Sequence, residues 1–216
     1  MGNGLFITFE GSEGCGKSTQ IQRLHAHLEA AGAHTMVVRE PGGTAAGEEI
    51  RQLVLQHRTD DTPIAPECEL LLFAASRAQL VREKIVPALM SGVHVIADRF
   101  YDSTTVYQGF GRGLDLSAIR QINHFAVGGS HPDMTFLLDL DPAEGHARAM
   151  QRSHGRLDRM ESESMEFFEK VRAGYLRLAR EEAPRFTVLD GSLPRERLEA
   201  EIWSAVQARL ARLASR

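Results

Sequence analysis

Short apolar runs alternate along the chain with longer segments in which apolar residues recur every three or four positions. The short runs are rich in Val, Ile, Leu and Phe and predict strands at residues 5–10, 34–39, 94–98, 135–139 and 185–190. The longer segments predict helices at residues 17–31, 66–90, 117–127, 142–152, 161–183 and 194–215. This alternation predicts an α/β fold with a five-stranded parallel sheet and helices on both faces.

The predicted topology indicates where the chemistry lies. Right-handed crossovers bring the carboxyl ends of parallel strands to one edge of the sheet, and ligands bind in the crevice outside that edge. The sequence has no internal repeat and no low-complexity linker, so we expect one domain over residues 1–216. The polar segment 151–159 contains Gly155 and several arginines, a composition that suits a mobile flap and a plain solvated loop equally well.

The charge balance and the cysteine content argue against several classes of protein. The 216 residues include 25 Lys and Arg against 29 Asp and Glu, so we expect no broad nucleic-acid surface. No apolar run approaches the roughly 18–20 residues that span a bilayer, so we expect no membrane association. Cys15 and Cys68 form no CxxC pair, which is typical of a cytoplasmic protein in a reducing compartment.

Residues 11–18 form a G-x-x-x-x-G-K-S motif between the first predicted strand and the first predicted helix. Glycines let such a loop bend until its backbone N–H groups converge on a phosphate chain, and the helix N-terminus faces the same anion. Lys17 supplies a cation for the outer phosphates, and the Ser18 hydroxyl can ligate Mg²⁺. Cys15 inside the loop is either a reactive thiol or a small residue that fits. The motif predicts a nucleotide site formed by Gly11, Ser12, Glu13, Gly14, Cys15, Gly16, Lys17, Ser18 and Thr19.

Several charged residues lie close to the ends of the first two predicted strands. Glu13 stands inside the phosphate loop, where bound polyphosphate repels a carboxylate. It therefore faces a hydroxyl, a second substrate or Mg²⁺, or it is a solvated loop acid. Arg39 and Glu40 precede a Pro-Gly-Gly turn and either pair with each other or reach the crevice. Arg51, one helix later, is either a phosphate ligand or an ordinary surface arginine.

Asp98 and Arg99 end the third predicted strand. An aspartate at the end of a buried strand is how phosphate-loop proteins hold Mg²⁺, so Asp98 is a metal-ligand candidate together with Ser18. Arginine binds phosphate in a bidentate manner, and the position of Arg99 predicts a clamp on a second anion. The alternative is an Asp98–Arg99 pair that serves structure only.

Two further groups are candidates for binding a base and its sugar. Phe73 and Arg77 are four residues apart on a predicted helix, so they share one face and suit a flat heterocycle. The alternative is a core Phe beside a surface Arg. Residues 103–108, Ser-Thr-Thr-Val-Tyr-Gln, add hydroxyl and amide groups that orient neutral ligands, although Ser103 and Thr104 equally suit helix caps.

The segment after the fourth strand carries the candidate flap. Asp141 before Pro142 indicates a helix N-cap with proline at the first helical position. Arginines on a closing flap would neutralise charge on a transferring phosphoryl group, but a basic, solvated helix end has the same composition. The candidates are Arg148, Arg152, Arg156 and Arg159.

Six stretches, in order, make the chain similar to the thymidylate kinases, particularly the bacterial ones. They lie at residues 9–19, 39–44, 71–77, 98–100, 107–109 and 157–159 and read FEGSEGCGKST, REPGGT, LLFAASR, DRF, YQG and LDR. Each is weak alone, but the six together are specific and extend over nearly the whole chain. The resemblance implies a phosphate-loop kinase fold with a short lid at residues 148–160. It also implies phosphoryl transfer from Mg-ATP to dTMP and a homodimer.

The resemblance assigns roles to the matching residues at the acceptor end. Phe73 is expected to stack on thymine and Arg77 to bind a base carbonyl. Glu13 is expected to face the sugar. Base and sugar are further fixed by Thr104, Gln108 and Tyr107, and the acceptor phosphate is held by Arg99, Arg39 and Arg51.

The donor end is expected to bind ATP through the phosphate loop and Mg²⁺ through Ser18 and Asp98. Positions 12–15 of the loop carry no basic residue, which is similar to the group of these kinases with arginines on the lid. Residues 153–155 lengthen the lid, so Arg148, Arg152 and Arg156 all remain candidates to reach ATP. The expected catalytic residues are Lys17, Arg99, Arg152 and Arg156.

The expected reaction needs no general base, because the second pKa of an acceptor phosphate is about 6. The protein has only to bring two anions together and stabilise charge on the migrating group. Two alternatives remain at this point. A GTP-dependent switch would carry N-K-x-D and D-x-x-G stretches, which the sequence lacks at the required places. Another nucleotide kinase of the same fold would differ only in its acceptor, and dUMP differs from dTMP by one methyl group.

Overall fold

The computed structural model describes residues 4–56 and 63–214, which contain a central parallel sheet. Its strands are β1 (Phe6–Glu10), β2 (Thr35–Arg39), β3 (His94–Asp98), β4 (Met134–Asp139) and β5 (Phe186–Asp190). Neighbouring strands pair in parallel in the order β2-β3-β1-β4-β5. The predicted α/β class and five-stranded parallel sheet are therefore confirmed, and each strand lies within one residue of its predicted bounds.

Helices connect the strands, and most were predicted. They are α1 (Lys17–Ala30), α2 (Ala45–Leu55), α3 (Pro66–Leu80), α4 (Val86–Met90), α5 (Tyr101–Thr104), α6 (Leu116–Val127), α7 (Pro142–Arg152), α8 (Met165–Glu181) and α9 (Arg195–Ala214). The ranges of α2 and α5 were not among the predicted ones, and α8 begins later than predicted because Ser164 caps it. The predicted end of the last helix, Ser215, and residues 1–3 of the expected domain lie outside the described residues.

Residues 66–90, expected as one helical segment, are divided by a change of helix type. A π-helical turn, η1 (Val81–Ile85), joins α3 to α4, and Pro87 lies in the first turn of α4. Proline has no N–H, so it cannot donate the α-helical hydrogen bond to the carbonyl four residues earlier. A second π-helical segment, η2 (Thr105–Gly111), follows α5.

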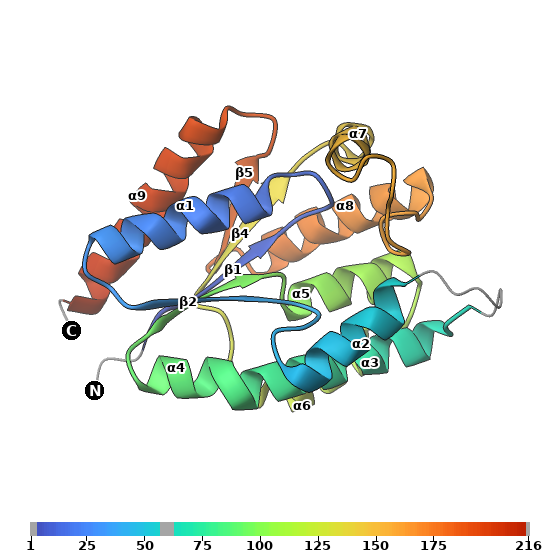
Figure 1. Cartoon of the computed structure of the whole chain (residues 1–216), viewed down its shortest axis with the longest axis horizontal. Coiled ribbons are helices and arrows are strands. Elements are labelled where there is room, and N and C mark those ends of the chain that lie inside the picture. Colours follow the sequence, from blue (N-terminus) through green and yellow to red (C-terminus); the bar gives the residue numbers. More distant parts are fainter. Residues whose placement is uncertain (1–3, 57–62, 215–216) are drawn as a thin grey trace.

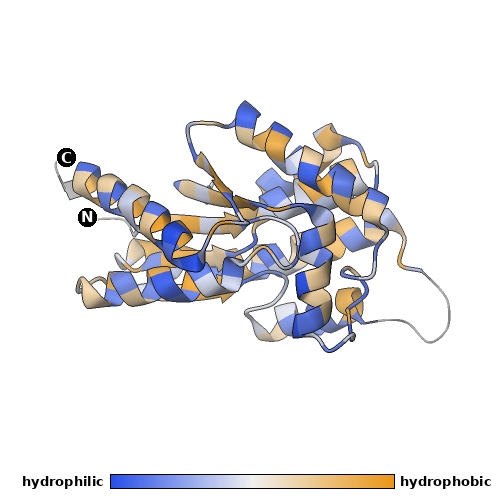
Figure 2. Ribbon diagram, turned by 90° about the horizontal axis from the view of Figure 1, so that it is seen from above, coloured by the Kyte–Doolittle hydropathy of each residue, from blue (hydrophilic) through white to orange (hydrophobic). Residues whose placement is uncertain are grey.

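Helices cover both faces of the sheet, and successive side chains of a strand point to opposite faces. Ile7 and Phe9 pack with α1 and α9 on one side, whereas Phe6 packs with α3 and α4 on the other. Helix α8 and η2 extend the second face across β4. Figure 1 shows α1 and α9 on one side of the strands and α3, α4 and α6 on the other. Figure 2 shows the largely hydrophobic strands enclosed by helices in which hydrophilic and hydrophobic positions alternate.

The parallel register brings chemically important positions to one edge of the sheet. Asp98 on β3 lies opposite Phe9 of β1 and opposite Arg39 of β2. The phosphate loop, the Arg39-Glu40 corner and the Asp98-Arg99 corner therefore leave the sheet side by side. Every helix within residues 4–56 and 63–214 is too short or too polar to cross a bilayer.

Candidate active site

A cavity of about 1060 Å³ opens at the carboxyl edge of the sheet. At one end it is bounded by the phosphate loop, α1 and the turn after β5, and at the other by α3 and η2. Among the predicted site residues it is lined by Glu13, Gly14, Cys15, Gly16, Lys17, Ser18, Thr19, Arg39, Arg51, Phe73, Arg77, Asp98, Arg99, Thr104, Tyr107, Gln108, Arg148 and Arg152. Gly11, Ser12 and Arg156 are not among the lining residues.

The phosphate loop has the backbone that its glycines allow. Gly11 and Gly14 have φ values of 134° and 68°, and a Cβ on Gly14 would lie 2.2 Å from the carbonyl oxygen of Gly145 in α7. Lys17 is nearly buried, and its Nζ donates to the carbonyl oxygens of Gly11 and Ser12 at 3.0 and 2.8 Å. The loop therefore has a defined shape around one ammonium group, next to the N-terminus of α1.

Cys15 is buried within this loop. Its Sγ donates to the carbonyl oxygen of Ser12 at 3.0 Å, and the side chain belongs to the apolar cluster under α1 and α9. The environment is that of a small packing residue, which favours the second of the two interpretations of Cys15.

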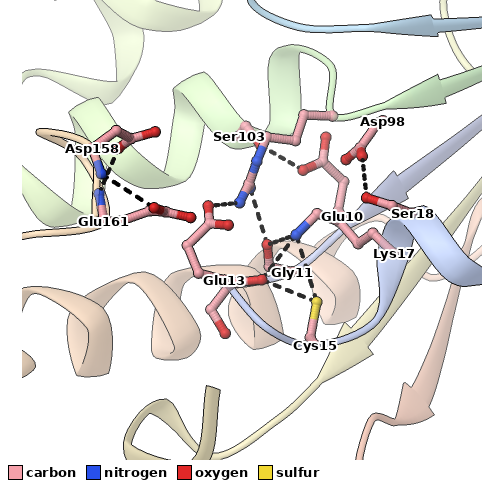
Figure 3. Close-up of polar contacts among 12 residues, drawn as sticks. Glu10, Gly11, Glu13, Cys15, Lys17, Ser18, Asp98, Ser103, Asp158 and Glu161 are labelled. Atoms are coloured by element: carbon pink, nitrogen blue, oxygen red, sulfur yellow. Dashed lines mark hydrogen bonds and ion pairs between the residues drawn. The ribbon is translucent and has the colours of Figure 1, made fainter. Parts of the chain in front are cut away.

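Ser18 and Asp98 meet at the edge of the sheet. Ser18 Oγ donates to Asp98 Oδ2 at 3.1 Å, and Figure 3 shows the two groups facing each other. Two oxygen donors at this spacing suit Mg²⁺, which binds one or two protein oxygens and takes its other ligands from phosphate and water. The described residues contain no cluster of three or more acidic, His or Cys side chains that could hold a metal by themselves.

Arg99 pairs with Glu13 and not with Asp98. Its Nη2 donates to Glu13 Oε1 and its Nη1 donates to the carbonyl oxygen of Gly11 at 3.0 Å, while its guanidinium lies 5.2 Å from the ring centroid of Tyr107. Burial raises the pKa of Glu13, but the charges of Arg99 and Lys17 outweigh it and lower that pKa to about 2. Two alternatives are therefore wrong: Glu13 is not a solvated acid, and Asp98 and Arg99 do not form a structural pair.

Two more arginines line the same cavity near β2. Arg39 Nη2 donates to both carboxylate oxygens of Glu48 at 2.9 and 2.8 Å. The alternative in which Arg39 pairs with Glu40 is therefore wrong. Arg51 Nη1 donates to the carbonyl oxygen of Pro41 at 3.0 Å. Burial and the charge of Arg39 lower the pKa of Arg51. The charge of Glu48 acts on Arg51 in the opposite direction, so the cavity has two arginines beside one carboxylate at this corner.

Arg77 is fully buried, so the interpretation as a surface arginine is wrong. Its Nε and Nη2 donate to Glu40 Oε2 at 2.8 and 2.6 Å, its Nη1 to Asn123 Oδ1 at 2.9 Å, and its Nη2 to Thr104 Oγ1 at 2.7 Å. Thr104 is the last residue of α5 and precedes η2, but its hydroxyl accepts from Arg77 and makes no capping hydrogen bond. The guanidinium is thus fixed in a buried position, and Phe73 lines the same cavity.

Gln108 and Tyr107 complete this end of the cavity. Gln108 Nε2 donates to Glu69 Oε1 at 2.8 Å, which orients the amide and leaves its carbonyl oxygen and second N–H for other partners. The Tyr107 hydroxyl is buried and has no hydrogen-bond partner among the described residues. Aromatic walls with a few fixed donors and acceptors are typical of a site for a flat heterocycle and its sugar.

The predicted lid surrounds the end of α7. Arg152 lines the cavity and its Nη2 donates to Glu161 Oε1 at 2.6 Å, whereas Arg156 is exposed on the loop beyond and lies outside the cavity lining. The structure therefore does not bring Arg156 to the other candidates. Asp141 accepts from the backbone N–H of Ala143 at 3.0 Å, so the predicted N-cap of α7 is confirmed.

Several residues of the site were not assigned a role from the sequence. Glu10, Tyr175, Glu69 and Glu161 all bind predicted site residues or the hydroxyls around them. Figure 3 shows Glu161 pointing toward Glu13, and burial and the Glu13 charge both raise the pKa of Glu161. The sequence did not single out Glu10, because four of the five strands end in an acid: Glu10, Asp98, Asp139 and Asp190. The other three residues lie on helices or loops whose patterns do not distinguish them.

The site can be compared with known proteins. A family model described as Thymidylate kinase matches residues 9–202. A thymidylate kinase of Deinococcus radiodurans is 51% identical over 209 residues, 97% of this chain and 99% of that protein. One from Chlorobaculum parvum is 46% identical over 211 residues, 94% of this chain and 96% of that protein. One from Caldanaerobacter subterraneus is 48% identical over 189 residues, 87% of this chain and 88% of that protein.

Proposed function

The chain belongs to the thymidylate kinase family and phosphorylates dTMP to dTDP with ATP. On this premise we propose which residues of the cavity bind each substrate. The observation that carries the proposal is the position of Arg99. Its guanidinium contacts the phosphate loop at Gly11 and lies over the ring of Tyr107 in the opposite wall. The two substrates would meet at this arginine, with the donor on the side of Lys17 and the acceptor on the side of Phe73.

The donor end would bind ATP through residues 11–19. Lys17 would turn its ammonium from the loop carbonyls to the outer phosphates, which offer a stronger acceptor than a neutral carbonyl. Ser18 and Asp98 would hold Mg²⁺, and their paired oxygens fit it. When bound, Mg²⁺ neutralises charge on the phosphates.

The acceptor end would bind dTMP between α3 and η2. Phe73 would stack on the base and Arg77 would donate to a base carbonyl, since Glu40 and Thr104 hold the guanidinium still. Tyr107, Thr104 and Gln108 would fix the base and sugar, and Glu13 would face the sugar. Three arginines would hold the acceptor phosphate: Arg39, Arg51 and Arg99.

The reaction would then proceed by positioning and charge neutralisation. The acceptor phosphate is already ionised at neutral pH and attacks without a general base. Arg99 would leave Glu13 for the acceptor phosphate, because a dianion is the stronger partner. Lys17 and Arg99 would stabilise charge on the migrating phosphoryl group from opposite sides.

The lid would complete the site from the α7 side. We place this chain in the group with lid arginines, since positions 12–15 carry no base and Arg152 lines the cavity. Arg152 would exchange Glu161 for the phosphates of ATP. Arg148 is a second candidate, whereas Arg156 would have to cross from the exposed loop at residues 153–157.

A homodimer and a single cytoplasmic domain over residues 1–216 complete the proposal. Support for the dimer comes from three exposed apolar side chains on the adjacent helices α2, α3 and α6, namely Leu53, Leu71 and Phe125. Phe125 is 84% exposed, which is unfavourable for a surface left to water. Light scattering on the purified chain would give twice the mass of the 216-residue chain if the proposal holds.

The acceptor assignment is tested with a panel of nucleoside monophosphates in the presence of Mg-ATP, scored by the diphosphate formed. We expect dTMP to be the best acceptor and dUMP to react more weakly, since one methyl group in a pocket is worth about 1–3 kcal/mol. Preference for a purine or cytosine nucleotide would contradict the proposed roles of Phe73, Arg77 and Gln108. A GTP-dependent switch, the other class considered, is excluded by membership of a kinase family.

A further inference from the structure

Glu10 is the last residue of β1 and lies directly before the phosphate loop. Its carboxylate is completely buried, and both oxygens accept hydrogen bonds. Oε1 accepts from the backbone N–H of Phe100 at 2.8 Å, and Oε2 accepts from Ser103 Oγ at 2.6 Å and from the Tyr175 hydroxyl at 2.9 Å. A buried acid requires such partners, but none of these three donors is a cation. Glu10 is not among the residues that line the cavity, so it can affect the reaction only through others.

Two of these partners connect Glu10 to the guanidinium of Arg99. Arg99 Nη1 donates to Ser103 Oγ at 3.1 Å and to the Tyr175 hydroxyl at 3.3 Å. A hydroxyl has one hydrogen and two lone pairs, so a hydroxyl that donates to Glu10 presents its lone pairs to Arg99. The carboxylate therefore orients the acceptors that hold one edge of the guanidinium. Figure 3 shows the carboxylate of Glu10 directed toward Ser103.

The third partner connects Glu10 to the backbone of Arg99. Arg99 has a φ of 68°, a left-handed conformation that is unfavourable for a residue with a side chain. The peptide after it is held by Glu10 through the N–H of Phe100, and the peptide before it is held by the carbonyl oxygen of Phe9 at 3.0 Å. Such a conformation persists only where its surroundings impose it. One buried carboxylate thus fixes both the strained backbone and the head group of the same arginine.

We propose that Glu10 is a positioning residue that holds Arg99 in the conformation needed to bind the acceptor phosphate. The inference rests on the role proposed above for Arg99. Without the Glu10 carboxyl group, the Phe100 N–H loses its acceptor and the two hydroxyls lose the group that orients them. The guanidinium would then leave its alignment, and small displacements of a positioned group cost large factors in phosphate binding and rate.

The proposal is tested by comparing the binding of dTMP with the binding of thymidine by titration calorimetry. Thymidine carries the same base and sugar but no phosphate, so Arg99 does not contribute to its affinity. In Glu10→Gln we expect dTMP to bind about ten- to a hundredfold more weakly, the range of a charge-assisted hydrogen bond, while thymidine affinity stays within about twofold. Parallel loss of both affinities would mean a general structural role and would overturn the proposal.

A double-mutant cycle shows whether Glu10 acts through Arg99. Glu10→Gln introduced into Arg99→Ala should weaken dTMP binding by less than about twofold further, because the group it positions is gone. Additive losses would contradict the inference. If Arg99→Ala itself binds dTMP like the wild type, the proposed function of Arg99 fails. If Arg99→Ala is impaired and a folded Glu10→Gln is not, only the present inference fails.

Two further variants keep the test decisive if Glu10→Gln does not fold. Tyr175→Phe and Ser103→Ala each remove one of the two hydroxyls and leave the carboxylate in place, and each should lower the dTMP-to-thymidine affinity ratio. An unchanged ratio in both would overturn the proposal. Asp102→Asn is the matched control, since Asp102 is equally buried but pairs with Arg185 and does not contact Arg99. The Asp102 charge raises the pKa of Glu10, so Asp102→Asn favours the ionised carboxylate and should not lower the ratio. A loss like that of Glu10→Gln would indicate an effect of the buried network as a whole and would overturn the proposal.

Discussion

Ser18 and Asp98 lie eighty residues apart in the chain, and a hydrogen bond of 3.1 Å joins Ser18 Oγ to Asp98 Oδ2. Ser18 is the second residue of α1, the helix after the phosphate loop, and Asp98 ends β3, the strand that pairs with β1. The parallel register of β1 and β3 therefore brings together the hydroxyl and the carboxylate that suit a shared magnesium ion.

Loss of the Asp98 charge should weaken the use of magnesium. In Asp98→Asn we expect the Mg²⁺ concentration for half-maximal activity to rise by about tenfold or more, because the amide is a poorer ligand than the carboxylate. The measurement is a magnesium titration of dTDP formation at fixed ATP and dTMP. Asp141→Asn is the control, since Asn also caps a helix and this acid lies outside the cavity lining. An unchanged magnesium requirement in Asp98→Asn would exclude Asp98 as a ligand.

Removal of Arg77 should destabilise the fold as well as the base site. In Arg77→Met the Glu40 carboxylate loses its counter-charge in a buried position, which costs about 3–5 kcal/mol in comparable cases. Urea denaturation without ligand measures this loss. Adding Glu40→Gln to Arg77→Met should recover part of it, because burial already raises the pKa of Glu40 and the amide carries no charge. If the double variant is less stable than Arg77→Met, the pair is not the source of the loss.

Among the lid arginines, Arg152 should matter more than Arg156. Arg152 lines the cavity, while Arg156 is exposed outside its lining. We expect Arg152→Ala to lower kcat by about a hundredfold or more, since an arginine on a transferring phosphoryl group contributes strongly. Arg156→Ala should change kcat by less than about threefold, and the two are compared at saturating ATP and dTMP. The reverse order would assign the role to Arg156 and require the loop at residues 153–157 to close over the site.

The free energy of unfolding should change with pH in the range where Glu10 ionises. Burial, and then the charge of Asp102, raise the pKa of Glu10 from 4.5 to about 7, although Arg99 and the hydrogen bonds from Ser103 and Phe100 act in the opposite direction. The folded protein then retains a proton between pH 4.5 and 7 that the unfolded chain releases. The stabilising effect of this group is complete below pH 4.5 and is lost as the pH rises to 7.

The difference between the wild type and Glu10→Gln isolates this effect from the other carboxylates. We expect the free energy of unfolding of the wild type, relative to the variant, to fall by roughly 2–3 kcal/mol between pH 4.5 and 7.5. Urea denaturation of both proteins over this range gives the value. A difference that is flat with pH would show that Glu10 ionises in the folded protein as it does in the unfolded chain.

Much of the fold follows from local patterns in the sequence. The apolar runs at β1 and β3 and the periodicity of α1 act over a few residues, so their strands and helices were predicted almost to the residue. Helix α2 and segment 101–111 were not, because Val54 is the only apolar side chain of α2 that is buried and residues 105–111 form a π-helix, whose period differs from that of an α-helix. The phosphate loop was predicted from a local pattern as well, because its glycines and Lys17 lie within eight positions and the backbone needs that spacing.

The sequence by itself determined the class of fold, the phosphate loop and, through six ordered stretches, the family. Only the tertiary structure decided which charges pair. It joined Arg99 to Glu13, Arg77 to Glu40 and Arg152 to Glu161, and it placed Arg156 outside the cavity lining. A salt bridge depends on the positions of two side chains that different elements carry, and its strength on how far both are removed from water. The spacing of residues along one element gives neither property. The connection from Glu10 to Arg99 through Ser103 and Tyr175 is therefore seen only in the tertiary structure.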